Sequence, residues 1–266
     1  MSAQVAVAGI PFDANSSFLR GPALAPGKIR EAYRSDSANT FAESGRDLGS
    51  DAGWTDLGDL PVASPADFRN LKNRVHELAV QYPKLFVLGG DHSITAPVVR
   101  GIQAAHGNFS ILHIDAHPDL YDNFEDNPDS HASPFARIME EGLVQRLVQV
   151  GIRTLNAHQL QQAKRFGVEI IQMKHWNDNH VFTFDGPVYL SLDMDAIDPA
   201  FAPGVSHHEP GGFTSRQIIH LLHRLKGRII GADLVEFNPS RDPSGITAML
   251  AGKLYKEMLD LLLRTS

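Results

Sequence analysis

Four short segments of the sequence end in side chains that bind metal ions, and each follows a run of apolar, strand-like residues. Three of them carry the strings Gly-Gly-Asp-His, Asp-x-His-x-Asp and Asp-x-Asp, and the fourth carries a lone glutamate. The segments span residues 89–93, 115–119, 193–195 and 235–239. Four strand ends that converge on one crevice would bring two imidazoles and six carboxylates together, which is the chemistry of a metal site.

The spacing within these segments selects a set of candidate ligands. Alternate residues of an extended segment point to the same side, so that Asp115 can act with His117 and Asp193 with Asp195. The full set is His92, Asp115, His117, Asp119, Asp193 and Asp195. Oxygen donors with a minority of imidazole suit manganese, magnesium or a mixed-ligand zinc, and a set of this size suits two ions better than one. Two such ions lower the pKa of water from about 15.7 to near 7 and so supply a hydroxide nucleophile.

Each motif also has a structural explanation that needs no metal. An Asp-x-Asp after a strand is typical of a helix cap or a turn, and Gly-Gly-Asp-His is typical of a tight turn into a helix. These explanations fit one motif at a time and fit poorly to four motifs that follow successive strands. We predict turn or cap roles for Asp91 and Asp198, and a hydrogen-bonded core position for His113.

Length and composition limit the classes of protein to consider. The 266 residues are enough for one large domain and few for two, so we expect a single domain over residues 1–266. Cysteine is absent, which excludes disulfides, a thiolate nucleophile and sulfur-bound metals. The net charge of −7 argues against a nucleic-acid surface and is compatible with a small cationic substrate, although solubility alone explains it equally well.

The sequence also bears on location. No window of about 18 residues is apolar enough to span a membrane, so no membrane association is expected. Residues 1–5 contain no basic segment and run directly into a strand, so no leader peptide is expected. From these two observations we expect a cytoplasmic protein.

Short apolar strands alternate with helices along the chain, which predicts a mainly parallel sheet covered by helices on both faces. Strands are predicted over residues 4–9, 85–88, 110–114, 147–150, 168–173, 188–192 and 229–234. Helices are predicted over residues 26–33, 65–78, 96–105, 134–141, 158–166, 215–225 and 246–263, and residues 36–53 form a long surface excursion. In such sheets the ligand crevice lies beyond the carboxyl ends of the strands, where all four segments fall.

Taken together, these strings resemble the ureohydrolases, the family of the arginases and agmatinases, and within it the plant-type arginases. Longer runs at residues 15–23, 130–140, 202–212 and 236–239 extend the resemblance over nearly the whole chain. The resemblance implies the three-layer α/β/α fold of the family and assembly into homotrimers or homohexamers. It also implies two manganese ions, one held by His92, Asp115, Asp119 and Asp193, and the other held by Asp115, His117, Asp193 and Asp195.

The resemblance further implies roles for individual residues. His131 matches a loop histidine that protonates the leaving amine, and an ordinary histidine pKa near 6.5 suits that task. Glu236 matches an acid that pairs with the substrate guanidinium in bidentate fashion. Asp115 would bridge the metals and steady the tetrahedral intermediate. Residues near the far end of the substrate are expected in the segments 122–130 and 206–209, with Asn123 and His207 as the named candidates. Without the resemblance, solvated loop positions would be the simpler interpretation of His131 and His207.

The reaction implied is hydrolysis of L-arginine to L-ornithine and urea by a hydroxide that bridges two metal ions. Agmatine, which would give putrescine and urea, is the alternative substrate, and other guanidino acids also remain open. A rival of a different class is a non-catalytic binding protein on the same fold. The complete set of candidate ligands, together with His131 and Glu236, argues against that rival.

Overall fold

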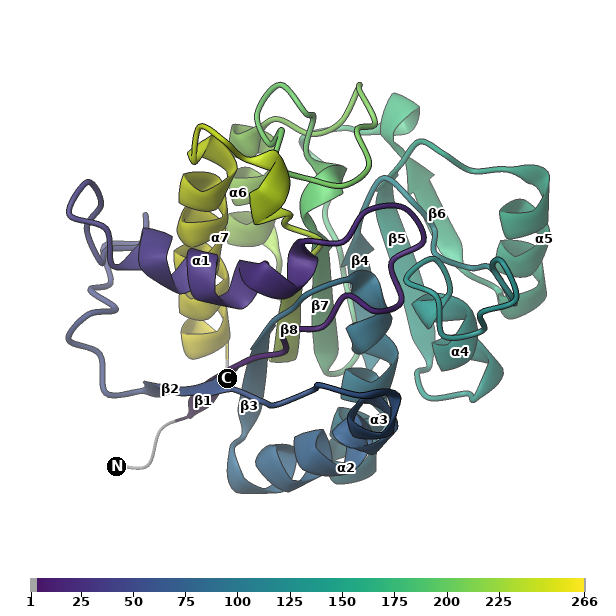
Figure 1. Cartoon of the computed structure of the whole chain (residues 1–266), viewed down its shortest axis with the longest axis horizontal. Coiled ribbons are helices and arrows are strands. Elements are labelled where there is room, and N and C mark those ends of the chain that lie inside the picture. The colour runs from purple at the N-terminus through teal and green to yellow at the C-terminus, as the bar shows by residue number, and fades with distance from the viewer. Residues whose placement is uncertain (1–3, 266) are drawn as a thin grey trace.

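The computed structural model describes residues 4–265 and contains one eight-stranded sheet between two layers of helices (Figure 1). Neighbouring strands are all parallel, in the order β2-β1-β3-β8-β7-β4-β5-β6. The strands are β1 (Val5–Gly9), β2 (Trp54–Asp59), β3 (Lys84–Leu88), β4 (Ser110–Ile114), β5 (Arg146–Ile152), β6 (Glu169–Gln172), β7 (Val188–Asp193) and β8 (Ile229–Val235). This architecture confirms the predicted three-layer α/β/α fold. Residues 1–3, part of the segment in which no leader peptide was predicted, lie outside the described residues.

The two helical layers cover opposite faces of the sheet. The helices are α1 (Ala25–Tyr33), α2 (Pro65–Gln81), α3 (Thr95–His106), α4 (Pro134–Glu140), α5 (Ala157–Phe166), α6 (Ser215–Arg224) and α7 (Ile246–Arg264). Helices α1, α6 and α7 pack together on one face, and α2, α3, α4 and α5 on the other (Figure 1). Along β3, Phe86 and Leu88 join the first core, whereas Leu85 and Val87 join the second. Because both faces are buried, the strands read as continuous apolar runs.

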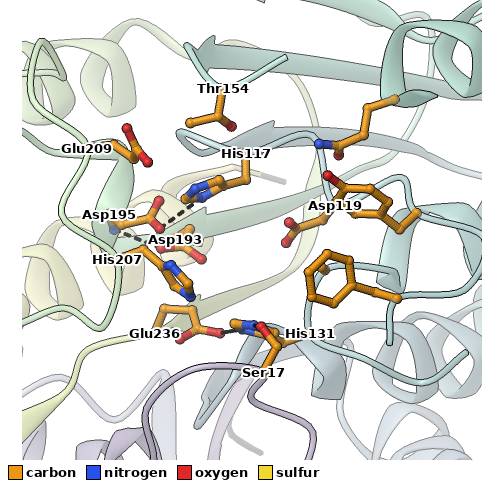
Figure 2. Close-up of a pocket in the computed structure, with 14 residues that line it drawn as sticks. Ser17, His117, Asp119, His131, Thr154, Asp193, Asp195, His207, Glu209 and Glu236 are labelled. Carbon is orange, nitrogen blue, oxygen red and sulfur yellow. Dashed lines mark hydrogen bonds and ion pairs between the residues drawn. The ribbon is translucent and has the colours of Figure 1, made fainter. Parts of the chain in front are cut away.

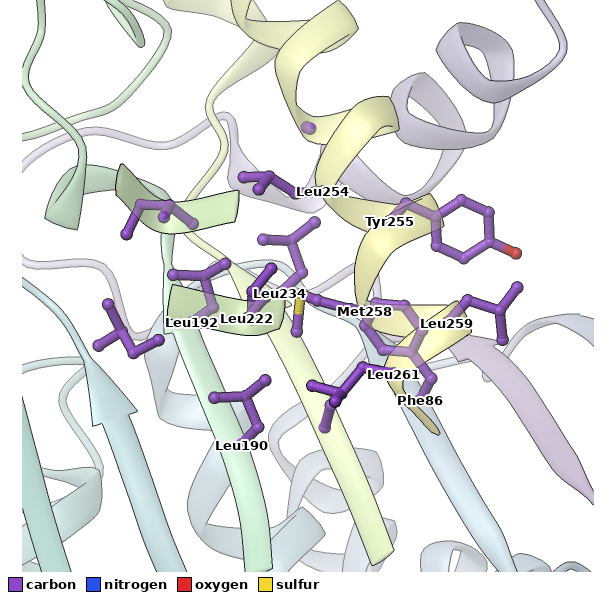
Figure 3. Packing of buried hydrophobic residues seen from close by; sticks show 14 of the residues in the cluster. Phe86, Leu190, Leu192, Leu222, Leu234, Leu254, Tyr255, Met258, Leu259 and Leu261 are labelled. Atoms are coloured by element: carbon purple, nitrogen blue, oxygen red, sulfur yellow. The ribbon is translucent and has the colours of Figure 1, made fainter. Parts of the chain in front are cut away.

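The longest helix, α7, packs lengthwise against the sheet. Its buried residues include Tyr255, Met258 and Leu259, which lie over Leu234 of β8 and Phe86 of β3 (Figure 3). Although α7 is long and largely buried, no helix within residues 4–265 combines the length and the apolar character needed to cross a membrane.

The pairing register aligns the ends of the four central strands. Leu88 of β3 and Leu192 of β7 both pair with Leu234 of β8, and Leu192 also pairs with Ile114 of β4. The four motif segments begin immediately beyond this row. The crevice predicted at the carboxyl ends of the strands is therefore built from β3, β8, β7 and β4, which are consecutive neighbours in the sheet.

Strand β2 was not predicted from the sequence. It pairs with β1 at the edge of the sheet and is only partly buried. Asp56 and Asp59 interrupt its apolar pattern, and both accept hydrogen bonds from the guanidinium of Arg30 on α1, at 2.8 and 2.5 Å. Ion pairs with a helix residue thus hold an edge strand that local hydrophobicity does not indicate.

Replacing Phe86 by alanine should lower the free energy of unfolding by about 3–5 kcal/mol, because a buried ring is lost and the cavity closes only in part. Phe86 is fully buried, and its ring centroid lies 5.5 Å from that of Tyr255. The control Val80→Ala, at a position of α2 that is 69% exposed, should change this energy by less than about 0.5 kcal/mol. Urea unfolding followed by circular dichroism measures the free energy of unfolding of both variants. Equal unfolding midpoints for the two would contradict the prediction.

Candidate metal centre and active site

Asp91 fastens the end of β3 to the first loop of the chain. A side chain at Gly90 would collide with the carbonyl oxygen of Phe12, so the two segments approach as closely as backbones can. The Asp91 carboxylate accepts hydrogen bonds from the backbone N–H of Asn15 (3.0 Å) and of Ser93 (3.1 Å). Asp91 is therefore a cap and a tether, as predicted, and it fixes the backbone from which the next side chain, His92, projects.

The first group of candidate ligands surrounds the Nδ1 atom of His92. This atom lies 3.0 Å from Oδ2 of Asp193, 3.1 Å from Oδ2 of Asp119 and 3.2 Å from Oδ2 of Asp115. Although it is buried, His92 Nδ1 has no hydrogen-bond partner of acceptable geometry among residues 4–265. Three carboxylate oxygens and one ring nitrogen thus face a common point.

The second group surrounds His117. Its Nδ1 atom lies 3.0 Å from Oδ2 of Asp195 and 3.5 Å from Oδ1 of Asp115. Asp115 therefore turns one carboxylate oxygen toward each group, which is the arrangement of a bridging ligand. Oδ1 of Asp193 accepts the backbone N–H of Asp195 (2.7 Å), and Oδ2 of Asp193 faces the first group.

A chain of hydrogen bonds sets the protonation of His92. Asp233, fully buried in β8, accepts the hydroxyl protons of Ser191 (2.6 Å), Tyr189 (2.8 Å) and Thr95 (2.7 Å). Because the Ser191 hydroxyl proton is directed to Asp233, its oxygen accepts the Nε2–H of His92, at 3.0 Å. His92 then carries its proton on Nε2 and presents the Nδ1 lone pair to the carboxylates.

Burial lowers the pKa of His92, but the carboxylates of Asp115, Asp119 and Asp193 raise it well above its ordinary value, so Nδ1 must hold either a proton or a metal ion between itself and these carboxylates. Burial and the charges of Asp195 and Asp115 raise the pKa of Asp193 well above its ordinary value, and the pKa of Asp195 is also raised, chiefly by burial. Carboxylates in this situation must take up protons or bind a cation. The oxygen and imidazole donors of both groups fit divalent ions of the manganese type.

His113 supports the centre without being a candidate ligand itself. Its Nε2 lies 2.7 Å from Oδ2 of Asp115, and its Nδ1 accepts the side-chain N–H of Gln149 at 3.1 Å. Its ring stacks on Phe135 with centroids 3.9 Å apart. Although His113 lies within reach of His92 and Asp115, both of its ring nitrogens are engaged, and it is the hydrogen-bonded core residue predicted from the sequence.

Two of the site's acids have an unusual backbone conformation. Asp119 and Glu236 have φ values of 50° and 62°, in the left-handed region that non-glycine residues seldom adopt. Such conformations cost about 1–3 kcal/mol each and cluster at functional sites, where the surrounding structure maintains them. Here they turn both side chains into the cavity, because both residues line it.

His131 is held between an acid and a hydroxyl group. Its Nδ1 lies 2.8 Å from Oε1 of Glu236, and its Nε2 lies 2.8 Å from Oγ of Ser17 (Figure 2). Burial lowers the pKa of His131, but the charge of Glu236 and the hydrogen bond to it outweigh burial and raise this pKa to about 9. The protonated ring donates from both nitrogens, so His131 is a positioned acid at neutral pH. Ser17 was not among the site residues predicted from the sequence.

A cavity of about 240 Å³ connects these groups. Of the residues expected near the far end of the substrate, His207 lines it, with its ring 5.6 Å from that of His117 and 5.5 Å from that of His131. Asn123 is exposed and does not line the cavity, which corrects the prediction; the aromatic side chain of the next residue, Phe124, lies there instead. Further lining residues that the sequence did not indicate are Tyr121, Thr154 and Gln159, and Glu209, which belongs to the segment 206–209 expected near the far end of the substrate, also lines the cavity.

Comparison with known proteins identifies the family. A model described as the arginase family matches residues 3–260. The chain belongs to the arginase family. It is 46% identical over 280 residues to a protein named "Arginase 1, mitochondrial" from Arabidopsis thaliana, with 96% of this chain and 80% of the relative covered. The structure of an arginase from Medicago truncatula has a TM-score of 0.91 at 42% identity, with 98% of this chain and 88% of that chain covered.

A more distant member of the arginase family broadens the comparison. A guanidinobutyrase from Pseudomonas aeruginosa is 32% identical over 278 residues, with 97% of this chain and 86% of the relative covered. Together the matches confirm the predicted ureohydrolase family, the likeness to plant arginases and the enzyme class, a ureohydrolase.

The expected cytoplasmic location is wrong. The matching arginases from Arabidopsis and rice are named mitochondrial or chloroplastic/mitochondrial, which contradicts that expectation. The expectation rested on the lack of basic residues at the start of the sequence. Targeting segments are addresses read by receptors and are not part of the folded domain, so the fold and composition do not encode them.

Replacing Asp233 by asparagine should weaken manganese binding by about 10- to 100-fold, because the amide no longer orients the Ser191 hydroxyl and thereby His92. Isothermal titration calorimetry measures the affinity, and circular dichroism verifies the fold. The control Glu169→Gln, on β6, alters an exposed ion pair with Arg146 of β5 and should leave the affinity unchanged. A folded Asp233→Asn protein with the affinity of the parent would disprove this supporting role.

Proposed function

We propose that the chain hydrolyses the guanidinium group of L-arginine to L-ornithine and urea with a binuclear manganese centre. The observation that carries this proposal is that members of both imidazole–carboxylate groups line one cavity beside the Glu236–His131 pair, namely Asp119 and Asp193 of the first group and His117 and Asp195 of the second (Figure 2). Relatives named arginase, at 44% and 46% identity, support arginine as the substrate. The complete set of ligands argues against a non-catalytic binding protein.

The two groups determine which residues would hold the ions. One ion would be held by His92, Asp115, Asp119 and Asp193, and the other by Asp115, His117, Asp193 and Asp195. We favour manganese because carboxylate oxygens outnumber imidazoles in both groups. When bound, such ions supply a nucleophile from water at neutral pH, because coordination lowers the pKa of water from about 15.7 to about 7. Asp115, with one oxygen toward each group, would keep the two positions in a fixed relation.

Glu236 would orient the guanidinium. Its Oε1 atom already accepts the backbone N–H of His92 and the ring N–H of His131, both at 2.8 Å. Since a carboxylate oxygen has two lone pairs, Oε2 is the atom left for the substrate. This supports one charge-assisted hydrogen bond from the guanidinium to Oε2, in place of the bidentate pair expected from the sequence. A fixed guanidinium plane beside the ligands reduces the entropic part of the barrier.

His131 would protonate the leaving nitrogen. Its Nδ1–H is held by Glu236, so the transferable proton is the one on Nε2, which is directed to Ser17 at the cavity wall. Transfer of this proton lets the nitrogen leave as an amine rather than as an amide anion. The ring that remains is neutral and keeps its hydrogen bond to Glu236.

Agmatine is the second candidate substrate, and one observation favours it. Among the cavity-lining residues that the structure describes, none is a lysine or an arginine that could pair with the carboxylate of arginine. Agmatine lacks that carboxylate and keeps the guanidinium. Other guanidino acids have weaker support, from relatives at 32% and 34% identity that are named guanidinobutyrase and guanidino acid hydrolase.

We further propose that residues 1–266 form one ureohydrolase domain, since all eight strands belong to one sheet. On the resemblance to the ureohydrolases, we propose assembly into homotrimers or homohexamers. Light scattering from the purified protein would give the number of copies directly.

Purified protein loaded with manganese should release urea from arginine, and more slowly from agmatine. Ornithine and putrescine, quantified side by side at equal substrate concentrations, distinguish the two reactions.

Asp193→Ala should lose bound manganese and lower urea release at least about 100-fold, because it removes an oxygen from both groups of ligands. Absence of urea from every guanidino compound would refute the hydrolase assignment, and retention of two ions by Asp193→Ala would refute the shared role of Asp193.

The rate of arginine hydrolysis should fall as the pH rises through about 9, where His131 loses its proton. Because its pKa is raised, His131 stays protonated up to about pH 9. The rate of hydrolysis therefore falls only on the alkaline side, or alkaline limb, of the pH–rate profile. Glu236→Gln removes the charge that raises the pKa and should move this limb toward the ordinary histidine value of about 6.5, in addition to lowering the overall rate. A limb at the same pH in both proteins would exclude His131 as the titrating acid.

A further inference from the structure

The cavity contains an acid that the proposed reaction does not use. Glu209 lies in the loop between β7 and α6 and lines the cavity with Thr154 and His207. In Figure 2, Ser17, His131 and Glu236 lie at one end of the view, and Glu209 and Thr154 lie at the other, with Asp193, Asp195 and His117 between them. Within residues 4–265 the Glu209 carboxylate takes part in no hydrogen bond or ion pair, so both of its oxygens are available to a ligand.

The backbone of Glu209 is anchored to the metal centre. Arg153, just beyond β5, donates to the carbonyl oxygen of Glu209 from Nε (2.9 Å) and Nη2 (2.6 Å), and also from Nη2 to the carbonyl oxygen of Asp195 (2.6 Å). Two residues further along, Gly211 donates its N–H to Asp198 at 2.7 Å. The distance between Glu209 and the ligand Asp195 is therefore set by a shared arginine rather than by a free loop.

Two residues at this end of the cavity, Thr154 and Arg153, offer the ligand no free hydrogen-bond donor. The hydroxyl of Thr154 gives its proton to the carbonyl oxygen of Ala116 (3.1 Å), which leaves only its lone pairs to face the cavity. Arg153 cannot act as a free cation, because its guanidinium also donates from Nη1 to the carbonyl oxygens of Gly151 and Ala196, and all five of its N–H groups are then engaged. A carboxylate and a hydroxyl oxygen on the wall of the same cavity suit a ligand that donates hydrogen bonds, which an ammonium does and a carboxylate does not.

We propose that Glu209 binds the ammonium group at the far end of the substrate and so determines specificity. The cavity then selects guanidino compounds that carry this ammonium, such as arginine and agmatine, against compounds that carry only a carboxylate, such as 4-guanidinobutyrate. An ammonium bound to Glu209 gains a charge-assisted hydrogen bond, whereas a carboxylate at the same place meets a like charge. The inference rests on the proposed function, because it takes the guanidinium to lie beside Glu236.

The test compares Glu209→Gln with the parent protein on arginine, agmatine and 4-guanidinobutyrate, with manganese present. The parent should favour both ammonium-bearing substrates over 4-guanidinobutyrate by at least about 10-fold in kcat/KM, since a charge-assisted hydrogen bond is worth about one such factor or more. Glu209→Gln should lose most of this preference, mainly through a higher KM for arginine and agmatine. Glu31→Gln, which makes the same change of charge at an exposed residue of α1, should keep the preference.

A binding measurement separates this inference from the proposed function. Calorimetric titration of manganese-loaded proteins with agmatine and with 4-guanidinobutyrate reports recognition with turnover suppressed when the parent and Glu209→Gln both also carry His131→Asn, which removes the proton donor for the leaving nitrogen. Tighter binding of agmatine by the parent, lost in Glu209→Gln, supports the role of Glu209 even if no compound is hydrolysed, in which case the proposed function alone fails. The role of Glu209 would be overturned if the parent showed no preference for agmatine over 4-guanidinobutyrate. It would also be overturned if a folded Glu209→Gln protein kept that preference.

Discussion

The register between the four central strands is the constraint on which the site depends. Leu88, Leu234, Leu192 and Ile114 pair across β3, β8, β7 and β4, so these strands end at the same height. The polar residues that follow come from four distant parts of the sequence, yet they emerge at one edge of the sheet. Because side chains alternate along a strand, a slip of one residue would turn a motif to the opposite face. The apolar rows, which take no part in chemistry, therefore fix the geometry of the groups that do.

The buried acids at this edge divide into two kinds according to their hydrogen-bond donors. Asp233 is surrounded by three hydroxyl groups, and Asp91 by backbone N–H and hydroxyl groups of the first loop and the β3 end. Asp119, Asp193 and Asp195 have fewer donors and crowd around imidazole nitrogens instead. The acids with these donors hold neighbouring elements together. Acids without enough donors need a cation, and this shortage is what makes the edge a candidate metal centre.

The sequence predicts features of this molecule that are local and fails for those that arise from distant contacts. The apolar runs indicated seven of the eight strands. Strand β2 was not predicted, because ion pairs from α1 hold it in place. Ser17 is an unremarkable loop serine whose partner, His131, lies 114 positions away. Asp233 gave a local signal, a charge inside an apolar strand, but its role depends on the side chains of two other elements. Asn123 was expected in the cavity and Phe124 occupies it, because loop orientation does not follow from residue type alone.

The position of β8 has a consequence for how the protein is made. It is the last strand of the chain, but it lies in the middle of the sheet, between β3 and β7. Until it is synthesised, β2-β1-β3 and β7-β4-β5-β6 are two separate half-sheets, each with an unpaired inner edge. During translation, the candidate ligand that follows β3, His92, cannot meet the candidate ligands that follow β4 and β7. The growing chain must also avoid aggregation through its unpaired strand edges. Assembly of the catalytic centre therefore coincides with the final joining of the sheet, so that a truncated chain would have neither.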